Sequence, residues 1–265
     1  MKYGCCLNMV SSGPDRTGGE WIPQAAMAGC DYVELPLAEM MLLEEVEFKA
    51  LKKRLEDTGI PCRACNNFYP GTLRLTGPES DKDRILGYSS AALKRAGELG
   101  ASCVVFGSGK ARSIPPGFSY EAGYDQIAGL LRRLSPIAEV YGISVAIEPL
   151  RKAECNTINT LKEGYRLAQD VNEKNIRVLV DFYHLQEEKE SVNDIMLYGK
   201  KYLEHVHFAN PVGRIYPRRA DEALYRPFFG ALKAVGYDKA VSFEAYSKDF
   251  VNDLKDALRL GRELG

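Results

Sequence analysis

The chain has 265 residues, of which 45% are hydrophobic and 27% charged, and its 35 basic and 36 acidic residues give a formal net charge of −1. This composition is ordinary for a globular protein, and the length suits one α/β barrel. Because a basic excess is absent, no field of one sign is available to hold a polyanion, which argues against a nucleic acid partner. No run reaches about 18 apolar residues, so no membrane partner is expected.

The seven cysteines are odd in number and scattered along the chain, and several lie in apolar runs. Buried cysteines behave as small hydrophobic residues, so reduced thiols in a cytoplasm are expected rather than a disulfide framework. Cys62 and Cys65 have C-x-x-C spacing, but no second pair follows, which favours a structural role over metal or redox work. The N-terminal stretch turns polar too early for a signal peptide. The sequence therefore predicts a cytoplasmic protein.

Short apolar runs typical of strands alternate with longer amphipathic stretches typical of helices. Strands are expected at 3–8, 31–36, 61–67, 101–107, 143–149, 177–182, 204–210 and 240–246, and helices at 20–28, 44–58, 81–99, 120–141, 159–173, 190–201, 221–235 and 247–263. Several helical stretches end in a glycine just before the next strand, as expected of left-handed helix stops. Eight such units, with no Gly-x-Gly-x-x-Gly after the first strand, predict an α/β fold, a closed (β/α)₈ TIM barrel forming one domain over 1–265.

The four strands of the C-terminal half each carry a residue able to bind a metal at or near the strand end. These are Glu148 in "VAIEP", Asp181 in "VLVDF", His207 in "HVHFA" and Glu244 in "VSFEA". In a barrel these ends converge on one mouth, where three unpaired carboxylates would repel one another. A divalent cation supplies the missing positive charge. Three carboxylates and one imidazole favour Mn²⁺ or Mg²⁺, with Co²⁺ or Zn²⁺ as alternatives.

The segments "VAIEPLRKAECNTINT", "VLVDFYHL", "HVHFANP" and "VSFEAY" resemble the sugar phosphate isomerase/epimerase family, the xylose isomerase-like barrels that include ketose 3-epimerases. The likeness covers most of the chain. It implies that one Mn²⁺ ion is bound by Glu148, Asp181, His207 and Glu244. It further implies that Glu148 and Glu244 are catalytic, one removing a proton and the other returning one. Contacts to the substrate are implied for Glu154, His184 and Arg214.

The expected function is that of a metal-dependent sugar isomerase or epimerase, which moves a proton next to a carbonyl through a metal-bound enediolate. Its partner would be a small sugar or polyol, and the resemblance is compatible with a homo-oligomer. A metal-dependent dehydratase of a keto-inositol or related keto-sugar is the alternative, because it begins with the same proton abstraction and His184 is available as general acid. An endonuclease IV-like phosphodiesterase shares the barrel, but its multinuclear zinc site uses more histidines than the three present here. A non-catalytic carbohydrate-binding barrel would leave the ligand set unexplained.

Several other residues allow two interpretations. His205 shares a strand face with His207 and is expected deeper in the barrel. Glu34, at the end of "DYVEL", either joins the mouth or pairs with a cation inside the barrel. The Gly-rich run at 106–112 is either a phosphate cradle or an ordinary loop, and its incomplete Walker spacing favours the loop. The Phe-Tyr-Pro run at 68–70 either lines the pocket or covers the barrel rim.

Overall fold

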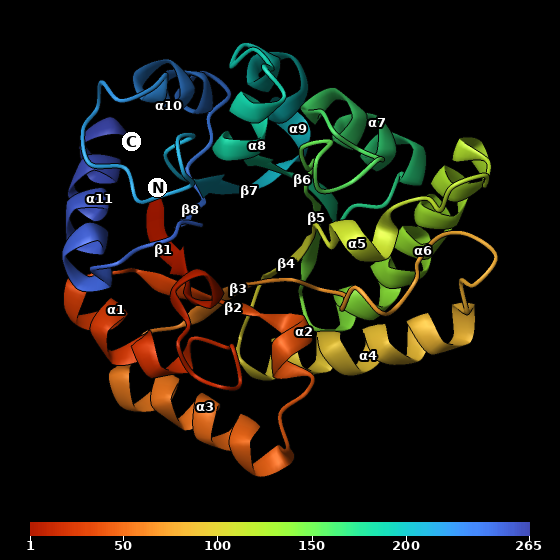
Figure 1. Cartoon of the computed structure of the whole chain (residues 1–265), viewed down its shortest axis with the longest axis horizontal. Helices are drawn as coiled ribbons and strands as arrows, with labels where there is room; N and C mark the ends of the chain where they lie inside the picture. Colours follow the sequence, from red (N-terminus) through yellow and green to blue (C-terminus); the bar gives the residue numbers. More distant parts are fainter.

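The apolar runs form eight parallel strands of a closed barrel in the computed structural model, which describes residues 1–265 (Figure 1). The strands are β1 (Lys2–Cys6), β2 (Tyr32–Pro36), β3 (Cys62–Asn66), β4 (Cys103–Phe106), β5 (Ser144–Ile147), β6 (Ile176–Asp181), β7 (Leu203–Phe208) and β8 (Ala240–Phe243). They pair in chain order, and β8 pairs with β1 to close the ring. The predicted (β/α)₈ TIM barrel is confirmed.

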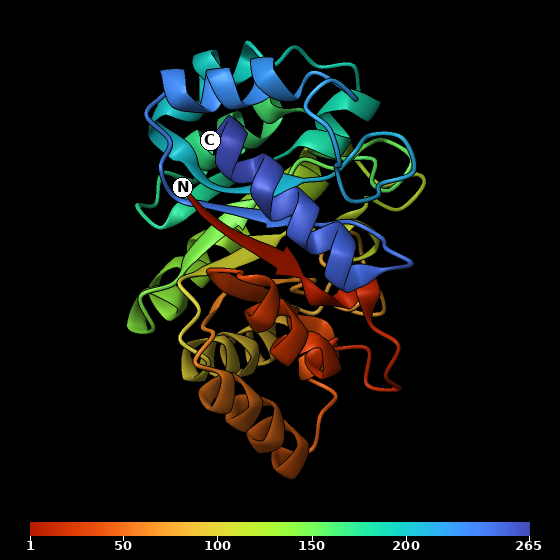
Figure 2. The same cartoon turned by 90° about the vertical axis from the view of Figure 1, so that its left-hand side faces the viewer.

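Helices surround the strands, as Figure 1 shows. They are α1 (Ile22–Ala28), α2 (Leu37–Met40), α3 (Glu45–Thr58), α4 (Lys82–Glu98), α5 (Gly109–Arg112), α6 (Tyr120–Val140), α7 (Leu161–Val171), α8 (Phe182–Glu187), α9 (Lys200–Tyr202), α10 (Tyr225–Ala234) and α11 (Phe250–Leu264). The glycines that follow α3, α4, α6 and α10 all have positive φ angles, as the helix stops require. The chain ends meet where the Tyr3 hydroxyl of β1 donates to the Gly261 carbonyl of α11 at 2.6 Å, and both ends lie close together in Figure 2. No helix is both long and apolar enough to cross a membrane.

The helix expected at 190–201 is confirmed only from residue 194 onward, and a further helix, α8, was not expected. Helix α8 begins directly after β6, because the last strand residue, Asp181, also caps the helix by accepting a hydrogen bond from the Tyr183 amide at 2.7 Å. This helix ends early, and Lys189 beyond it takes the left-handed conformation, with φ 57°. Within the expected range, residues 194–201 are helical, as a π-helical turn at Ile195–Gly199 that continues into α9.

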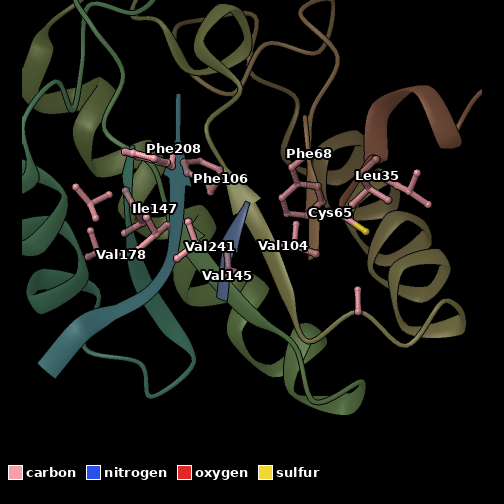
Figure 3. Packing of buried hydrophobic residues seen from close by; sticks show 14 of the residues in the cluster. Leu35, Cys65, Phe68, Val104, Phe106, Val145, Ile147, Val178, Phe208 and Val241 are labelled. Carbon is pink, nitrogen blue, oxygen red and sulfur yellow. The ribbon is translucent and has the colours of Figure 1, made fainter. Parts of the chain in front are cut away.

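The two faces of the strands are packed differently. Outward-facing residues such as Val104, Phe106 and Phe208 join the main hydrophobic core under the helices (Figure 3). Inward-facing residues of β3 to β6 form a separate small apolar cluster, made of Ala64, Cys103, Val105, Ala146 and Leu179. The inward faces of β2, β7 and β8 instead carry ionisable and polar side chains, all buried. The barrel interior is therefore apolar on one side and polar on the other.

All seven cysteines are free. Cys62 and Cys65 are buried in β3 with their sulfur atoms 4.0 Å apart, so the C-x-x-C spacing belongs to the packing of this strand.

Candidate active site

The four predicted metal ligands lie together at one end of the barrel. Glu148 directly follows β5, Asp181 ends β6, His207 is the penultimate residue of β7, and Glu244 directly follows β8. Each offers one donor atom, and these four atoms lie within 4.8 Å of one another. All four residues are at least nine-tenths buried. The strand ends therefore bring three carboxylates and one imidazole to a single point.

His207 is at the centre of the group. Its Nδ1 lies 3.0 Å from Glu148 Oε1 and 3.1 Å from Glu244 Oε2. On the other side of the ring, Nε2 lies 3.0 Å from Glu34 Oε1. The imidazole is thus held between carboxylates on both sides, and it has no exposed surface.

The motif "DFYH" folds back on itself because Asp181 serves both β6 and α8. Its Oδ1 accepts from the Tyr183 amide, whereas Oδ2 faces the site. The first turn of α8 then brings His184 back over the strand end, with Nε2 3.5 Å from Asp181 Oδ2. That nitrogen is buried and has no hydrogen-bond partner. His184 is therefore placed at the site with an unused polar atom.

Arg214 reaches the site from the loop after β7. Its backbone is left-handed, with φ 50°, and the loop is closed by a hydrogen bond from the Asn210 amide to the Ile215 carbonyl. The guanidinium contacts Glu244 Oε2 and lies 3.2 Å from Asp181 Oδ2. It therefore supplies positive charge where these two carboxylates converge.

The third predicted substrate contact, Glu154, lies at the edge of the site. Its carboxylate accepts from the Arg151 side chain at 2.7 Å and is 4.0 Å from Arg214. About a third of its side chain is exposed. All seven predicted site residues are thus brought to one end of the barrel, four at the centre and three around them.

The surroundings shift the pKa values of Glu148 and Glu244 in opposite directions. Burial raises the pKa of Glu148. Burial also opposes charge on Glu244, but the neighbouring Arg214 guanidinium holds the pKa of this carboxyl well below its usual range. Burial alone would lower the pKa of His207, yet the carboxylates of Glu34 and Glu244 hold it well above normal. The site is therefore a strongly coupled group of charges.

The donor set suits a divalent cation. Carboxylate oxygens and one imidazole nitrogen, all buried and converging, are ligands that hard and borderline ions accept. A cation taking Asp181 and Glu244 would compete with Arg214 for the same two oxygens. This competition requires Arg214 to share or give up contacts when an ion binds.

The sequence did not identify two residues that shape the site. Asn66, the last residue of β3, donates to Glu244 Oε1 at 3.3 Å, and its own Oδ1 is buried without a partner. Gly107 follows β4, and a Cβ atom there would lie 2.2 Å from Glu148 Oε2. Asn66 could have been found from the sequence, because it is a polar residue at the end of the third expected strand. Gly107 lies in the Gly-rich run at 106–112, but nothing in that run indicated a contact with Glu148.

The structure shows the contacts of the residues with two interpretations. His205 lies deeper in the barrel, as predicted, and bonds to Glu34 at 2.8 Å. Glu34 is fully buried between His205 and His207 and is not exposed at the mouth. The run at 106–112 contains the end of β4 and the short helix α5, in which Gly109 packs against the backbone of Glu154. Within the run at 68–70, Phe68 and Tyr69 are buried in the main core.

Comparison with known proteins identifies the family. The family described as xylose isomerase-like TIM barrel matches residues 22–264. The chain belongs to this family. A ketose 3-epimerase of Arthrobacter globiformis is 26% identical over all of this chain and 90% of its own length. A 3-dehydro-D-guloside 4-epimerase of Escherichia coli is 24% identical over 77% of this chain and 78% of its own length.

The fold agrees with solved structures of the same kind. A D-psicose 3-epimerase from Clostridium cellulolyticum H10, solved with D-tagatose, superimposes with a TM-score of 0.85 at 19% identity, covering 100% of this chain and 99% of the other. The curated relatives are named epimerases or isomerases. The chain is therefore an enzyme of the isomerase class, as the sequence predicted.

Proposed function

We propose that the protein is a metal-dependent sugar epimerase or isomerase that transfers a proton at the carbon next to a carbonyl. The observation that carries this proposal is the convergence of Glu148, Asp181, His207 and Glu244 within 4.8 Å at one end of the barrel. The names of the relatives support a small sugar or polyol as substrate, since they act on ketoses and on a keto-glycoside.

One divalent ion would be held by these four residues. Mn²⁺ is the preferred ion on the basis of the ligand types, with Mg²⁺, Co²⁺ and Zn²⁺ as alternatives. When bound, the ion supplies positive charge beside the carbonyl and neighbouring hydroxyl oxygens, which makes the adjacent C–H bond more acidic.

Glu148 and Glu244 would carry the proton. Both carboxylates contact the same nitrogen of His207, at 3.0 and 3.1 Å, but they come from strands on either side of it. Two carboxylates around one point suit a reaction in which one removes the proton and the other returns one to the opposite face of the carbon. Glu154, His184 and Arg214 would hold the substrate hydroxyls, and the unpaired Nε2 of His184 is available for such a contact.

The same unpaired nitrogen favours a second candidate. A dehydratase of a keto-inositol or related keto-sugar begins with the same proton abstraction and then needs a general acid for the departing hydroxyl. His184 Nε2 is buried beside Asp181 and has no other partner, so it is suited to that role.

Deuterium exchange tests the proposal directly. The Mn²⁺-loaded protein is incubated in D₂O with a panel of ketoses and keto-polyols, and NMR identifies the labelled carbon after the ion is removed. We expect label next to the carbonyl without loss of water. Loss of water would indicate the dehydratase, and no exchange with any member of the panel would count against both.

Glu148→Gln and Glu244→Gln test the proton carriers, because glutamine keeps the size and one oxygen but cannot take a proton at neutral pH. Each should lower turnover by roughly 10²–10⁴-fold even in protein shown to contain metal. Glu154→Gln is the control, and it should act mainly on substrate affinity and cost less. If metal-loaded Glu148→Gln exchanged protons at the parental rate, Glu148 would be a ligand only, and a one-base reaction through Glu244 would replace the two-base epimerase.

A further inference from the structure

A buried polar group lies beneath His207, and the proposed reaction leaves it without a role. It consists of Glu34, His205, Ser242 and Tyr32, each no more than 1% exposed. The Glu34 carboxylate is at its centre, with Oε1 3.0 Å from His207 Nε2 and Oε2 2.8 Å from His205 Nε2. The Ser242 hydroxyl donates to Oε2 at 2.6 Å and lies 2.8 Å from the Tyr32 hydroxyl.

A carboxylate in such a position is costly unless its oxygens are satisfied, and here both are. An ionised carboxylate only accepts hydrogen bonds, so the ring nitrogen facing it must carry a hydrogen. Glu34 therefore requires a proton on Nε2 of His207. Nδ1, on the other side of the ring, faces Glu148 and Glu244, and without an ion it also carries a hydrogen toward them. A divalent ion held by these carboxylates would replace the hydrogen on Nδ1, whereas Nε2 would keep its own toward Glu34.

We propose that Glu34 is a positioning residue that fixes the ring and tautomer of His207 so that Nδ1 is presented to the divalent ion. This inference rests on the proposed function, since it concerns the same metal site. Carboxylates that bond the second nitrogen of a metal-binding histidine orient the ring and increase its basicity. The Ser242 and His205 contacts in turn hold the Glu34 carboxylate in place.

A competing arrangement makes the opposite assignment. Cys6, Glu34 and His207 also offer donor atoms within 4.8 Å of one another, and the Cys6 sulfur lies 3.9 Å from His207 Nε2. If that group held the ion, Nε2 would be the ligand and Glu34 would bind metal directly. The two arrangements thus differ in which nitrogen of His207 binds the ion.

The assignment can be measured in the whole protein loaded with Zn²⁺, which is diamagnetic. The chain contains three histidines, so ¹⁵N NMR of the imidazole rings gives three pairs of signals to assign. We expect His207 to bind Zn²⁺ through Nδ1 and to keep its hydrogen on Nε2. A metal-bound Nε2 would overturn the proposal, and this measurement on the parent needs no variant to fold.

Glu34→Gln tests the energetic consequence. Glutamine has one acceptor and one donor group at the end of its side chain, so it cannot accept from both histidines and Ser242 at once. We expect Zn²⁺ affinity, measured by calorimetric titration, to fall roughly 10–100-fold while circular dichroism stays that of the parent. Cys6→Ala is the matched control and should bind Zn²⁺ like the parent.

Besides a metal-bound Nε2, three results would overturn the inference. These are parental Zn²⁺ affinity in Glu34→Gln, a large loss of affinity in Cys6→Ala, and a parent that binds no divalent ion. Only the third also removes the proposed function, so the two failures are distinguishable.

Discussion

Gly107 leaves the space that the Glu148 carboxylate fills. The residue is buried directly after β4, and a Cβ atom there would lie 2.2 Å from Glu148 Oε2. The atom it would meet is the end of a side chain, so the carboxylate can move aside while the backbone stays in place. A methyl group at this position should therefore disturb the site much more than the fold.

Gly107→Ala should lower turnover by up to about 10²-fold, because a shift of about 1 Å in a catalytic group has effects of that size. Thermal unfolding and steady-state kinetics check the two properties separately. Gly87→Ala is the control, since it lies on the exposed face of α4 with nothing within 4 Å of the added atom. It should leave turnover unchanged and raise stability by about 0.5–1 kcal/mol. Equal turnover in the two variants would contradict the role of Gly107.

Among single residues, the sequence predicted those whose type and position repeat from strand to strand. Glu148, Asp181, His207 and Glu244 were visible because each interrupts or ends an apolar run at the same place in its βα unit. The pairing of Glu34 with His207 was not visible, since it joins β2 to β7 across the barrel and depends on strand register.

The loops at the mouth are held together by a buried arginine in α5. Arg112 has no exposed surface and takes part in no ion pair within 4.0 Å. Its guanidinium instead donates to main-chain carbonyls, to Phe106 at 2.8 Å and to Ile158 and Thr157 at 3.2 and 3.4 Å. It thereby connects the end of β4 to the 148–160 segment that carries Glu148 and Glu154.

Replacing Arg112 by Leu should destabilise the protein, because buried carbonyls that lose their donors cost about 1–3 kcal/mol each. We expect a loss of at least about 3 kcal/mol in the free energy of unfolding, measured with urea. Arg112→Lys keeps the charge and some donors, so its loss should be smaller. A leucine variant as stable as the lysine variant would show that these hydrogen bonds contribute little.

The strands and helices were predicted well where each residue has a single structural role. The strands and most helices follow from apolar periodicity and glycine stops. Helix α8 after β6 was missed because Asp181 has three tasks, as strand end, helix cap and site residue. Its carboxylate was interpreted only as a ligand, so the cap that starts α8 was overlooked.

The proposed metal site depends on the arrangement of the whole barrel. The four proposed ligands come from four consecutive strands, β5 to β8, and Glu34 connects His207 to β2. Unfolding separates these strands and destroys the site. An ion that binds only the folded barrel should therefore stabilise all of it.

Saturating the protein with Mn²⁺ tests this expectation. With free Mn²⁺ at about 100 times its dissociation constant, the stabilisation is about 2.7 kcal/mol, which for a chain of this size raises Tm by about 5–10 °C. Removing the ion with EDTA should reverse the shift. The quantity to compare is the difference in Tm between the Mn²⁺-loaded and the EDTA-treated samples of one preparation. The absolute stability of the metal-free protein then does not affect the comparison.

Asp181→Ala should abolish this metal-dependent shift, and elemental analysis should find the bound ion lost. The variant also removes the cap of α8, which alone costs about 1 kcal/mol, so its melting temperature without metal should already be lower. Asp181→Asn separates the two effects, because asparagine retains a cap acceptor but lacks the charge. Asp238→Ala is the control, as this aspartate is exposed before β8 and away from the four ligands. If Mn²⁺ raised the Tm of Asp181→Ala and of Asp238→Ala equally, Asp181 would not be a ligand.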